Sequence, residues 1–142
     1  IRLTFVEKPE MFETIMQLSS SDSFASLPCW VLSRAATAPE YRGQSVNMKL
    51  RCEAYRFILA RERRVGRSPI TEDSKALLPK YVFGTALKDS RRLSFLQSIG
   101  YEFLPGQQNW DGYISALADE VLAFRLAIEK LESALLMIDP RR

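Results

Sequence analysis

A turn that carries an arginine and a glycine, Arg42–Gly43, lies between a predicted buried strand and a long predicted helix. Such a turn gathers free backbone N–H groups at one point, and the helix dipole adds partial positive charge there. The Arg42 side chain adds a full charge, and Gly43 allows a ligand to approach the backbone. This pattern predicts a site for an anion such as a phosphate. In the alternative interpretation, Gly43 only turns the chain and Ser45 caps the helix.

The sequence contains no histidine, which limits the chemistry that it can perform. Histidine triads, Cys–His dyads and nearly all zinc sites are excluded. Proton transfer must use Asp, Glu, Tyr, Lys, Cys, water or the backbone, which favours a mechanism that works by positioning a ligand. The two cysteines, Cys29 and Cys52, lie in apolar stretches. They are predicted to be reduced core residues, as expected of a cytoplasmic protein.

The 142 residues are expected to form one domain that covers residues 1–142. No apolar run approaches the roughly 18 residues of a membrane span. The net charge is only +3, so local clusters matter more than the total. One basic cluster, RERRVGR (Arg61–Arg67), falls where a helix should end, and a solvated helix end is its simplest explanation. The alternatives are contact with an acidic protein or, less favoured because no aromatic residues are interleaved, with a nucleic acid.

Hydrophobic periodicity predicts strands that alternate with helices and hold this turn in place. A helix over Gln44–Arg64 has a wide apolar face suited to packing on a sheet. The run YVFGTAL (Tyr81–Leu87) is typical of a strand buried on both faces. Further strands are expected at Ile1–Glu7, Leu27–Thr37, Tyr101–Leu104 and Asp111–Leu117, and further helices after Pro9, at Glu72–Leu78, between Asp89 and Gly100, and at Ala118–Ile138. This order predicts an α/β protein with a mixed sheet covered by helices.

The sequence PEYRGQSVNMKL (Pro39–Leu50) resembles the acyl-CoA loop of the Gcn5-related N-acetyltransferase (GNAT) superfamily, which reads R-x-x-G-x-G/A before a helix. Ser45 and Asn47 stand at the two later glycine positions. Downstream, the strand at Tyr81–Leu87 and the Gly100–Tyr101 pair are similar to that superfamily's strand, helix and G-F ending. Leu96 stands where the superfamily often has a tyrosine that protonates the leaving thiolate.

The sequence WVLSR (Trp30–Arg34) is similar to the signatures of two GNAT branches, the acyl-homoserine-lactone synthases and the N-acyl amino acid synthases. Val31 stands at the glutamate of the first signature. The resemblance implies a mixed, mainly antiparallel central sheet flanked by helices, with a C-terminal helix. That fold normally has two more strands before Trp30, for which Ser19–Leu27 is too short. Either this protein lacks that strand pair, or residues are absent from the chain at this point.

The resemblance implies an N-acyltransferase that moves an acyl group from an acyl thioester, carried by acyl carrier protein or CoA, to an amine such as an amino acid, with no metal. Ser33, Arg34 and Tyr101 are candidates for catalysis, beside Glu40 and Asp89 as weaker candidates for proton transfer. A docking site for the acidic carrier protein would consist of Arg61, Arg63, Arg64 and Arg67. The donor-binding residues would be Leu32, Ala35, Arg42, Gly43, Gln44, Ser45, Val46 and Asn47.

A non-catalytic binding or regulatory domain of the same fold is the alternative. Val31, Ser45, Asn47 and Leu96 all depart from the pattern where chemistry is usually placed. The predicted C-terminal helix, Ala118–Ile138, would then supply the partner surface. Its apolar residues have heptad-like spacing and would pack on the same domain or on a second copy in a homodimer; they are Val121, Phe124, Ile128, Leu131, Leu135 and Ile138.

Overall fold

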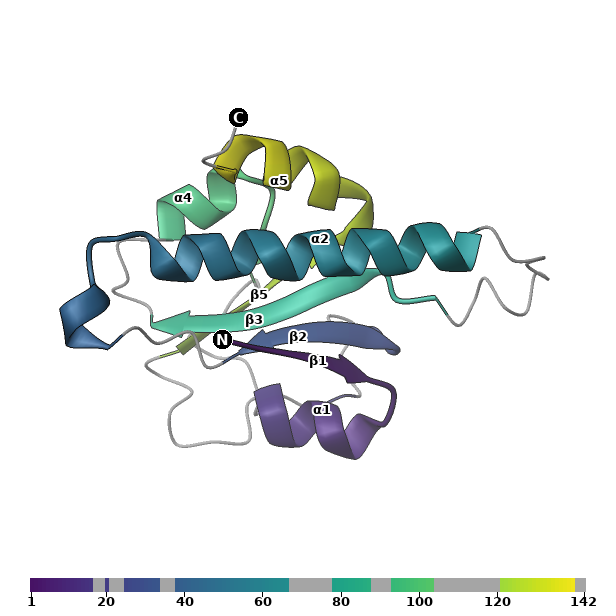
Figure 1. Cartoon of the computed structure of the whole chain (residues 1–142). Helices are drawn as coiled ribbons and strands as arrows, with labels where there is room; N and C mark the ends of the chain where they lie inside the picture. The colour runs from purple at the N-terminus through teal and green to yellow at the C-terminus, as the bar shows by residue number, and fades with distance from the viewer. Residues whose placement is uncertain are drawn as a thin grey trace.

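The computed structural model describes residues 1–16, 20, 25–33, 38–66, 78–87, 93–103 and 121–139. Strands and helices alternate along much of this part of the chain (Figure 1). In chain order the elements are β1 (Arg2–Val6), α1 (Pro9–Met16), β2 (Cys29–Ser33), the 3-10 helix η1 (Pro39–Tyr41), α2 (Val46–Gly66), β3 (Tyr81–Leu87), α4 (Leu93–Ser98), β4 (Glu102–Phe103), β5 (Val121–Ala127), the 3-10 helix η4 (Ile128–Lys130) and α5 (Leu131–Ile138).

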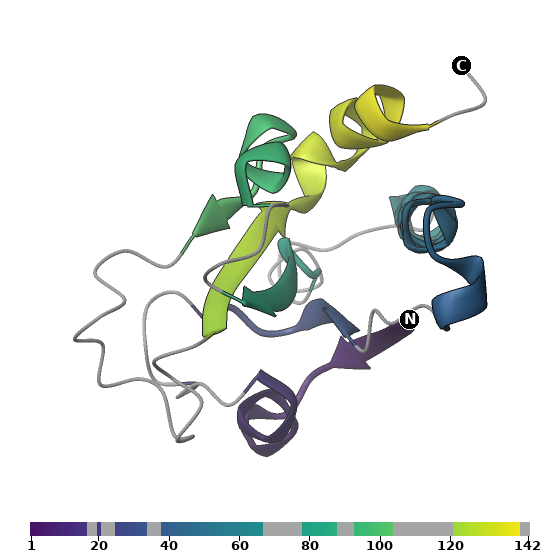
Figure 2. The ribbon, with the colours of Figure 1, turned by 90° about the vertical axis from the view of Figure 1, so that its left-hand side faces the viewer.

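The five strands form one mixed sheet in the order β1-β2-β3-β5-β4. Strands β2 and β3 are parallel, and the other three neighbouring pairs are antiparallel. The parallel pair follows from the crossover through α2, because parallel strands need a long connection. Helices α2, α4 and α5 cover one face of the sheet and α1 covers the other (Figures 1 and 2). This arrangement confirms the predicted α/β class, with a mixed, mainly antiparallel sheet, flanking helices and a C-terminal helix.

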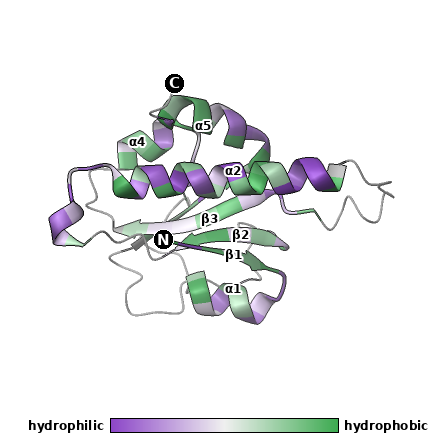
Figure 3. Cartoon of the chain, in the orientation of Figure 1, coloured by the Kyte–Doolittle hydropathy of each residue, from purple (hydrophilic) through white to green (hydrophobic). Residues whose placement is uncertain are grey.

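Alternation along the strands divides the core into two layers. In β2, Trp30 and Leu32 face the layer under α2, whereas Cys29 and Val31 face α1. The strands of the sheet are largely hydrophobic, and α2 alternates between hydrophilic and hydrophobic positions along its length (Figure 3). This pattern is that of an amphipathic helix packed on an apolar sheet.

The C-terminal prediction was wrong over its first half. A helix was expected over Ala118–Ile138, but Val121–Ala127 forms β5 and the α-helix begins only at Leu131. Strand β5 lies inside the sheet and pairs with β3 and β4, so sheet pairing overrides the helical spacing of its apolar residues. The expected heptad stripe is largely internal, since Phe124, Leu131 and Ile138 are buried. The exposed apolar residues of α5 are instead Leu136 and Met137.

Most other elements lie where the sequence places them. β3 has the predicted bounds, and α2 begins and ends two residues later than Gln44–Arg64. Gly100 follows α4 with φ +110°, as predicted for a glycine that ends a helix. The strand at Asp111–Leu117, residues 34–37, residues 72–77 and Asp89 lie outside the described residues. No helix in the described part of the chain is long and apolar enough to cross a membrane.

Candidate functional site

The two parallel strands at the centre of the sheet pair over a short register. Trp30 pairs with Val82 and Val31 with Phe83. β2 continues to Ser33 and β3 to Leu87. The two strands are still adjacent at the next position, since a Cβ atom built at Gly84 would lie 3.3 Å from the carbonyl oxygen of Leu32.

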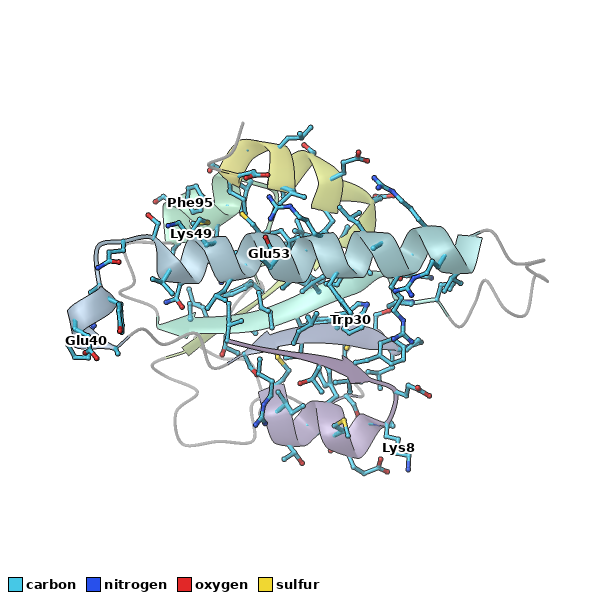
Figure 4. The ribbon with its side chains drawn as sticks, in the orientation of Figure 1. Lys8, Trp30, Glu40, Lys49, Glu53 and Phe95 are labelled. Atoms are coloured by element: carbon cyan, nitrogen blue, oxygen red, sulfur yellow. The ribbon has the colours of Figure 1, made fainter. Side chains whose placement is uncertain are left out.

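The amino terminus of α2 lies at this end of the sheet. The carboxyl end of β3 points to the same end of the molecule as η1 and the start of α2 (Figure 1). The side chains of Glu40, on η1, and Lys49, on α2, also lie at this end (Figure 4). Arg42 follows η1 and is exposed to solvent. Glu40 and the first N–H groups of α2 thus lie at the same end of the molecule as the carboxyl end of β3, whereas the Lys49 side chain lies on the side of α2 away from the sheet (Figure 4).

The turn before α2 has two residues in the left-handed region of backbone conformation. Gly43 has φ +84°, and a Cβ atom built there would meet nothing within 4 Å. Ser45 has φ +57°, a conformation that favours glycine, although it is a serine. Lys49 N donates a 3.0 Å hydrogen bond to Ser45 O, so Ser45 is the first residue whose carbonyl joins the helix. Ser45 therefore has the left-handed backbone that glycine usually adopts.

The expected side-chain cap by Ser45 is not observed. Among the described residues, no hydrogen bond of the Ser45 hydroxyl is present, and the backbone turn begins α2 without it. Two positions into α2, the Oδ1 atom of Asn47 is buried and has no hydrogen-bond partner in the described chain. A buried acceptor of this kind is costly unless a donor reaches it. The start of α2 therefore contains a buried, unsatisfied acceptor that lowers the stability of the folded state.

The other predicted donor-site residues differ in their surroundings. Leu32 is buried in the layer under α2, and Ser33 is partly buried at the end of β2. Gln44 is exposed and Val46 is partly buried. Arg34 and Ala35 lie outside the described residues. Of the predicted site residues, residues 42–47 lie at the start of α2, Leu32 and Ser33 lie at the end of β2, and Tyr101 directly precedes β4.

Tyr101 is part of a buried polar cluster with two residues of α2. Its side chain is 4% exposed, and its hydroxyl shares a short hydrogen bond with that of Tyr55, which is fully buried. Arg51 Nη1 donates to Tyr101 Oη at 3.0 Å and to Tyr55 Oη at 3.4 Å. Burial raises the pKa of Tyr101 well above its usual value, with a further contribution from Tyr55 that exceeds the lowering by Arg51. Tyr101 is therefore a neutral phenol at physiological pH.

The arginine cluster at the end of α2 is partly occupied by contacts within the molecule. The Arg61 guanidinium lies over the rings of Phe5 and Trp30, with its Cζ atom 5.0 and 5.4 Å from their centroids. Arg63 Nη2 lies 3.6 Å from Glu132 Oε1 of α5. Arg64 is exposed and has no such contact with the described residues, and Arg67 lies outside them. The predicted docking site for a carrier protein therefore has fewer unengaged cations than the sequence indicates.

Comparison with known proteins gives no matching family model, no similar curated protein and no similar solved structure. The site therefore has to be interpreted from its own geometry. Among the described residues, no group of three or more acidic or cysteine side chains could hold a metal ion.

Sequence reasoning missed the cluster of Arg51, Tyr55 and Tyr101. The periodicity of α2 places Tyr55 on its apolar face, but nothing local pairs this tyrosine with another one in a distant element. A weak signal was available, since Arg51 lies one turn before Tyr55 and next to the buried Cys52. A cation at the border of an apolar face is a position where a polar partner is expected.

Proposed function

We propose that this protein is an N-acyltransferase of the GNAT type, which binds an acyl thioester carried by CoA or by acyl carrier protein and transfers the acyl group to an amine, such as that of an amino acid. The observation that carries the proposal is the central parallel pair β2 and β3, whose register ends before either strand does, at the same end of the molecule as the amino terminus of α2. Under this proposal, an extended pantetheine arm lies along the carboxyl ends of the two strands. The phosphate that follows it fits a helix start with Arg42 beside it.

The strand order supports the same proposal. The central parallel pair, with β5 inserted between β3 and β4, corresponds to the acyltransferase sheet without the two strands that normally follow the first helix. In this chain β1 pairs directly with β2, over Arg2–Val6 and Cys29–Ser33. The left-handed backbone of Ser45 adds support, because it keeps the glycine-like turn in spite of the residue change.

Under this proposal, catalysis works mainly by positioning. Backbone groups at the ends of β2 and β3 hold the donor arm and polarise the thioester carbonyl. Gly43 to Asn47 and the Arg42 side chain hold the phosphates. The amine nitrogen bonds to the acyl carbon as the C–S bond breaks. The proton that the amine loses balances the proton that the leaving thiolate takes up.

Donor binding is tested by thermal unfolding and calorimetric titration with CoA, short- and long-chain acyl-CoA, and acyl carrier protein with its acyl chain. We expect at least one donor to raise the melting temperature and to bind in a saturable way. Arg42→Gln should weaken binding about 5- to 10-fold, because one charge near the phosphates is lost, on the order of 1 kcal/mol. The matched control is Arg64→Gln, an exposed arginine at the other end of α2, which should leave CoA binding unchanged. If no donor of either class binds, the proposal is wrong.

A non-catalytic domain of the same fold is the second candidate, and two positions favour it. Val31, where the signature has glutamate, is buried on the α1 side of the sheet. Leu96, where the superfamily often has its acid, is buried in the core under α2. An assay that follows release of free thiol with a panel of amines separates the two candidates. Saturable donor binding without amine-dependent thiol release would favour the binding domain.

A further inference from the structure

The Arg51 guanidinium is a largely desolvated cation with no carboxylate partner among the described residues. Its only hydrogen bonds to the described residues run from Nη1 to the hydroxyls of Tyr55 and Tyr101. Burial lowers the pKa of Arg51, but the two tyrosines raise it by more, so the side chain stays charged. Three other arginines of α2 have clear partners. Arg56 pairs with Glu53 and Asp139, Arg63 pairs with Glu132, and Arg61 lies over aromatic rings. A buried charge usually has such a counter-ion, because an uncompensated one is costly.

The two tyrosine hydroxyls leave other N–H donors of the Arg51 guanidinium unused, and these donors lie along one edge of the group. Both hydroxyls are bonded to the same nitrogen, Nη1, so Nε and Nη2 have no hydrogen bond to the described chain. In the described part of the chain, the buried polar atoms that lack a hydrogen-bond partner do not include Nε or Nη2 of Arg51. Both atoms therefore keep some contact with solvent. The Nε–Nη2 edge is the fork that binds a carboxylate through two parallel hydrogen bonds.

The position of this edge is held by buried groups on two sides. The Tyr101 ring meets the Phe124 ring edge-on, with centroids 4.9 Å apart, and Phe124 lies over Gly84 of β3. A Cβ atom at Gly84 would lie 2.7 Å from Phe124 and 3.3 Å from the carbonyl oxygen of Leu32. The tyrosines that hold Nη1 are therefore packed against the sheet, and the guanidinium is preorganised on the α2 side of it, without having to move to receive a ligand.

We propose that the Nε–Nη2 edge of Arg51, at the junction of α2 with the segment before β4, binds the carboxylate of a small ligand. One guanidinium charge matches one carboxylate charge, whereas a phosphate dianion would leave a buried negative charge uncompensated. The planar carboxylate also fits the planar fork. This site is independent of the donor function proposed above, because it uses none of the residues from Arg42 to Asn47.

The first test follows the Arg51 Nε–H signal of the wild-type protein by NMR while acetate or propionate is added at constant ionic strength. We expect a saturable shift of this signal with millimolar affinity and a rise in melting temperature. Acetamide, the neutral counterpart of acetate, should produce neither effect. An Nε–H signal that does not move with either carboxylate, or that moves equally with acetamide, overturns the proposal, as does tighter binding of inorganic phosphate.

The second test uses variants and the same probes. Arg51→Gln should weaken carboxylate binding at least tenfold, and Arg51→Lys should recover only part of it, because lysine keeps the charge but lacks the fork. Arg64→Gln is the matched control and should bind like the wild type. The double variant Tyr55→Phe/Tyr101→Phe keeps the cation but removes the two groups that orient it, and should bind several-fold more weakly. Carboxylate affinity that is unchanged in Arg51→Gln contradicts the proposal; the wild-type NMR titration decides the question even where that variant does not fold.

Discussion

At the scale of single residues, burial raises the pKa of two side chains, Cys29 and Tyr101. The sequence alone does not show how deeply either side chain is buried. Cys29 opens β2 and is fully buried between the sheet and α1, and Tyr101 is buried beneath α2. Burial raises the pKa of the Cys29 thiol from 9.0 to about 12 and raises the pKa of Tyr101 as well. Both groups are therefore protonated at neutral pH. Neither is suited to act as a base there, and Cys29 is a poor nucleophile.

The raised pKa of Cys29 predicts a loss of stability in alkaline solution. The folded state binds the thiol proton more tightly than the unfolded state, so this contribution is fully present below pH 9 and is lost as the pH rises toward 12. We expect the free energy of unfolding to fall by up to about 1.4 kcal/mol per pH unit in this window from this group alone. Urea unfolding at pH 8, 9, 10 and 11 measures it.

Cys29→Ala is the control for this prediction. Lysines and tyrosines titrate in both proteins, so only the difference between the two pH dependences reports on the thiol. The variant should be less stable at pH 8, because a buried side chain is shortened, and should lose stability less steeply above pH 9. Equal slopes in the two proteins would contradict the assignment of the shift to Cys29.

At the scale of elements, the start of α2 combines a strained turn with a long, strongly packed helix. Tyr55 and Ile58 are fully buried against the sheet, and the ion pair between Arg56 and Asp139 ties α2 to the end of α5. Tertiary contacts therefore hold the helix, and its first turn can keep an unfavourable backbone conformation. Ser45 is the residue at which that conformation occurs.

Replacing Ser45 by glycine should stabilise the protein. Glycine adopts φ +57° without the clash that a Cβ atom causes, and no hydrogen bond of the Ser45 hydroxyl to the described residues would be lost. We expect the free energy of unfolding to rise by roughly 0.5–1 kcal/mol, measured by urea unfolding. Ser133→Gly, the same change at an exposed position within α5, should lower it by about as much, because glycine weakens a right-handed helix interior. A loss of stability in Ser45→Gly would contradict the strain at this turn.

At the scale of the whole molecule, β5 joins the edge strand β4 to the rest of the sheet. It pairs with β3 from Val121 to Ala127 and also holds β4 through Arg125 and Phe124. The residues after it form α5, whose Leu131 and Ala134 are fully buried. The C-terminal segment is therefore part of the core and not an appended helix that a partner alone would cover.

A chain truncated after Glu120 should fail to fold cooperatively. The truncation removes β5, which lies between β3 and β4, and α5, which packs on α2. Apolar surface on both faces of the sheet is then uncovered. We expect loss of the near-ultraviolet circular dichroism signal and a broad, non-cooperative urea transition. The full chain with Leu136→Ala is the comparison, and it should stay within about 0.5 kcal/mol of the wild type because Leu136 is exposed. A cooperative transition in residues 1–120 would show that β5 is dispensable.

Local patterns were sufficient where one element alone sets the environment of its residues. The apolar run at Tyr81–Leu87 predicts the bounds of β3 to the residue. Its burial is less complete than predicted, since Val82, Phe83 and Gly84 are buried but Thr85 is exposed. The apolar face of α2 and the turn at Gly43 were predicted for the same reason: helical periodicity and glycine preferences are short-range properties. These patterns also predicted the α/β class, which the structure confirms, whereas the anion site before α2 stays a prediction.

Only the tertiary structure decided features that depend on residues far apart in the chain. Val121–Ala127 has apolar spacing that suits a helix and a buried strand alike, and pairing with β3 selects the strand. The parallel pairing of β2 with β3 joins strands that α2 and a long connection keep apart in sequence. The contact of Arg51 with Tyr101 joins residues 50 positions apart. Pairing, packing and desolvation are energies of the assembled core, so no local stretch of sequence contains them.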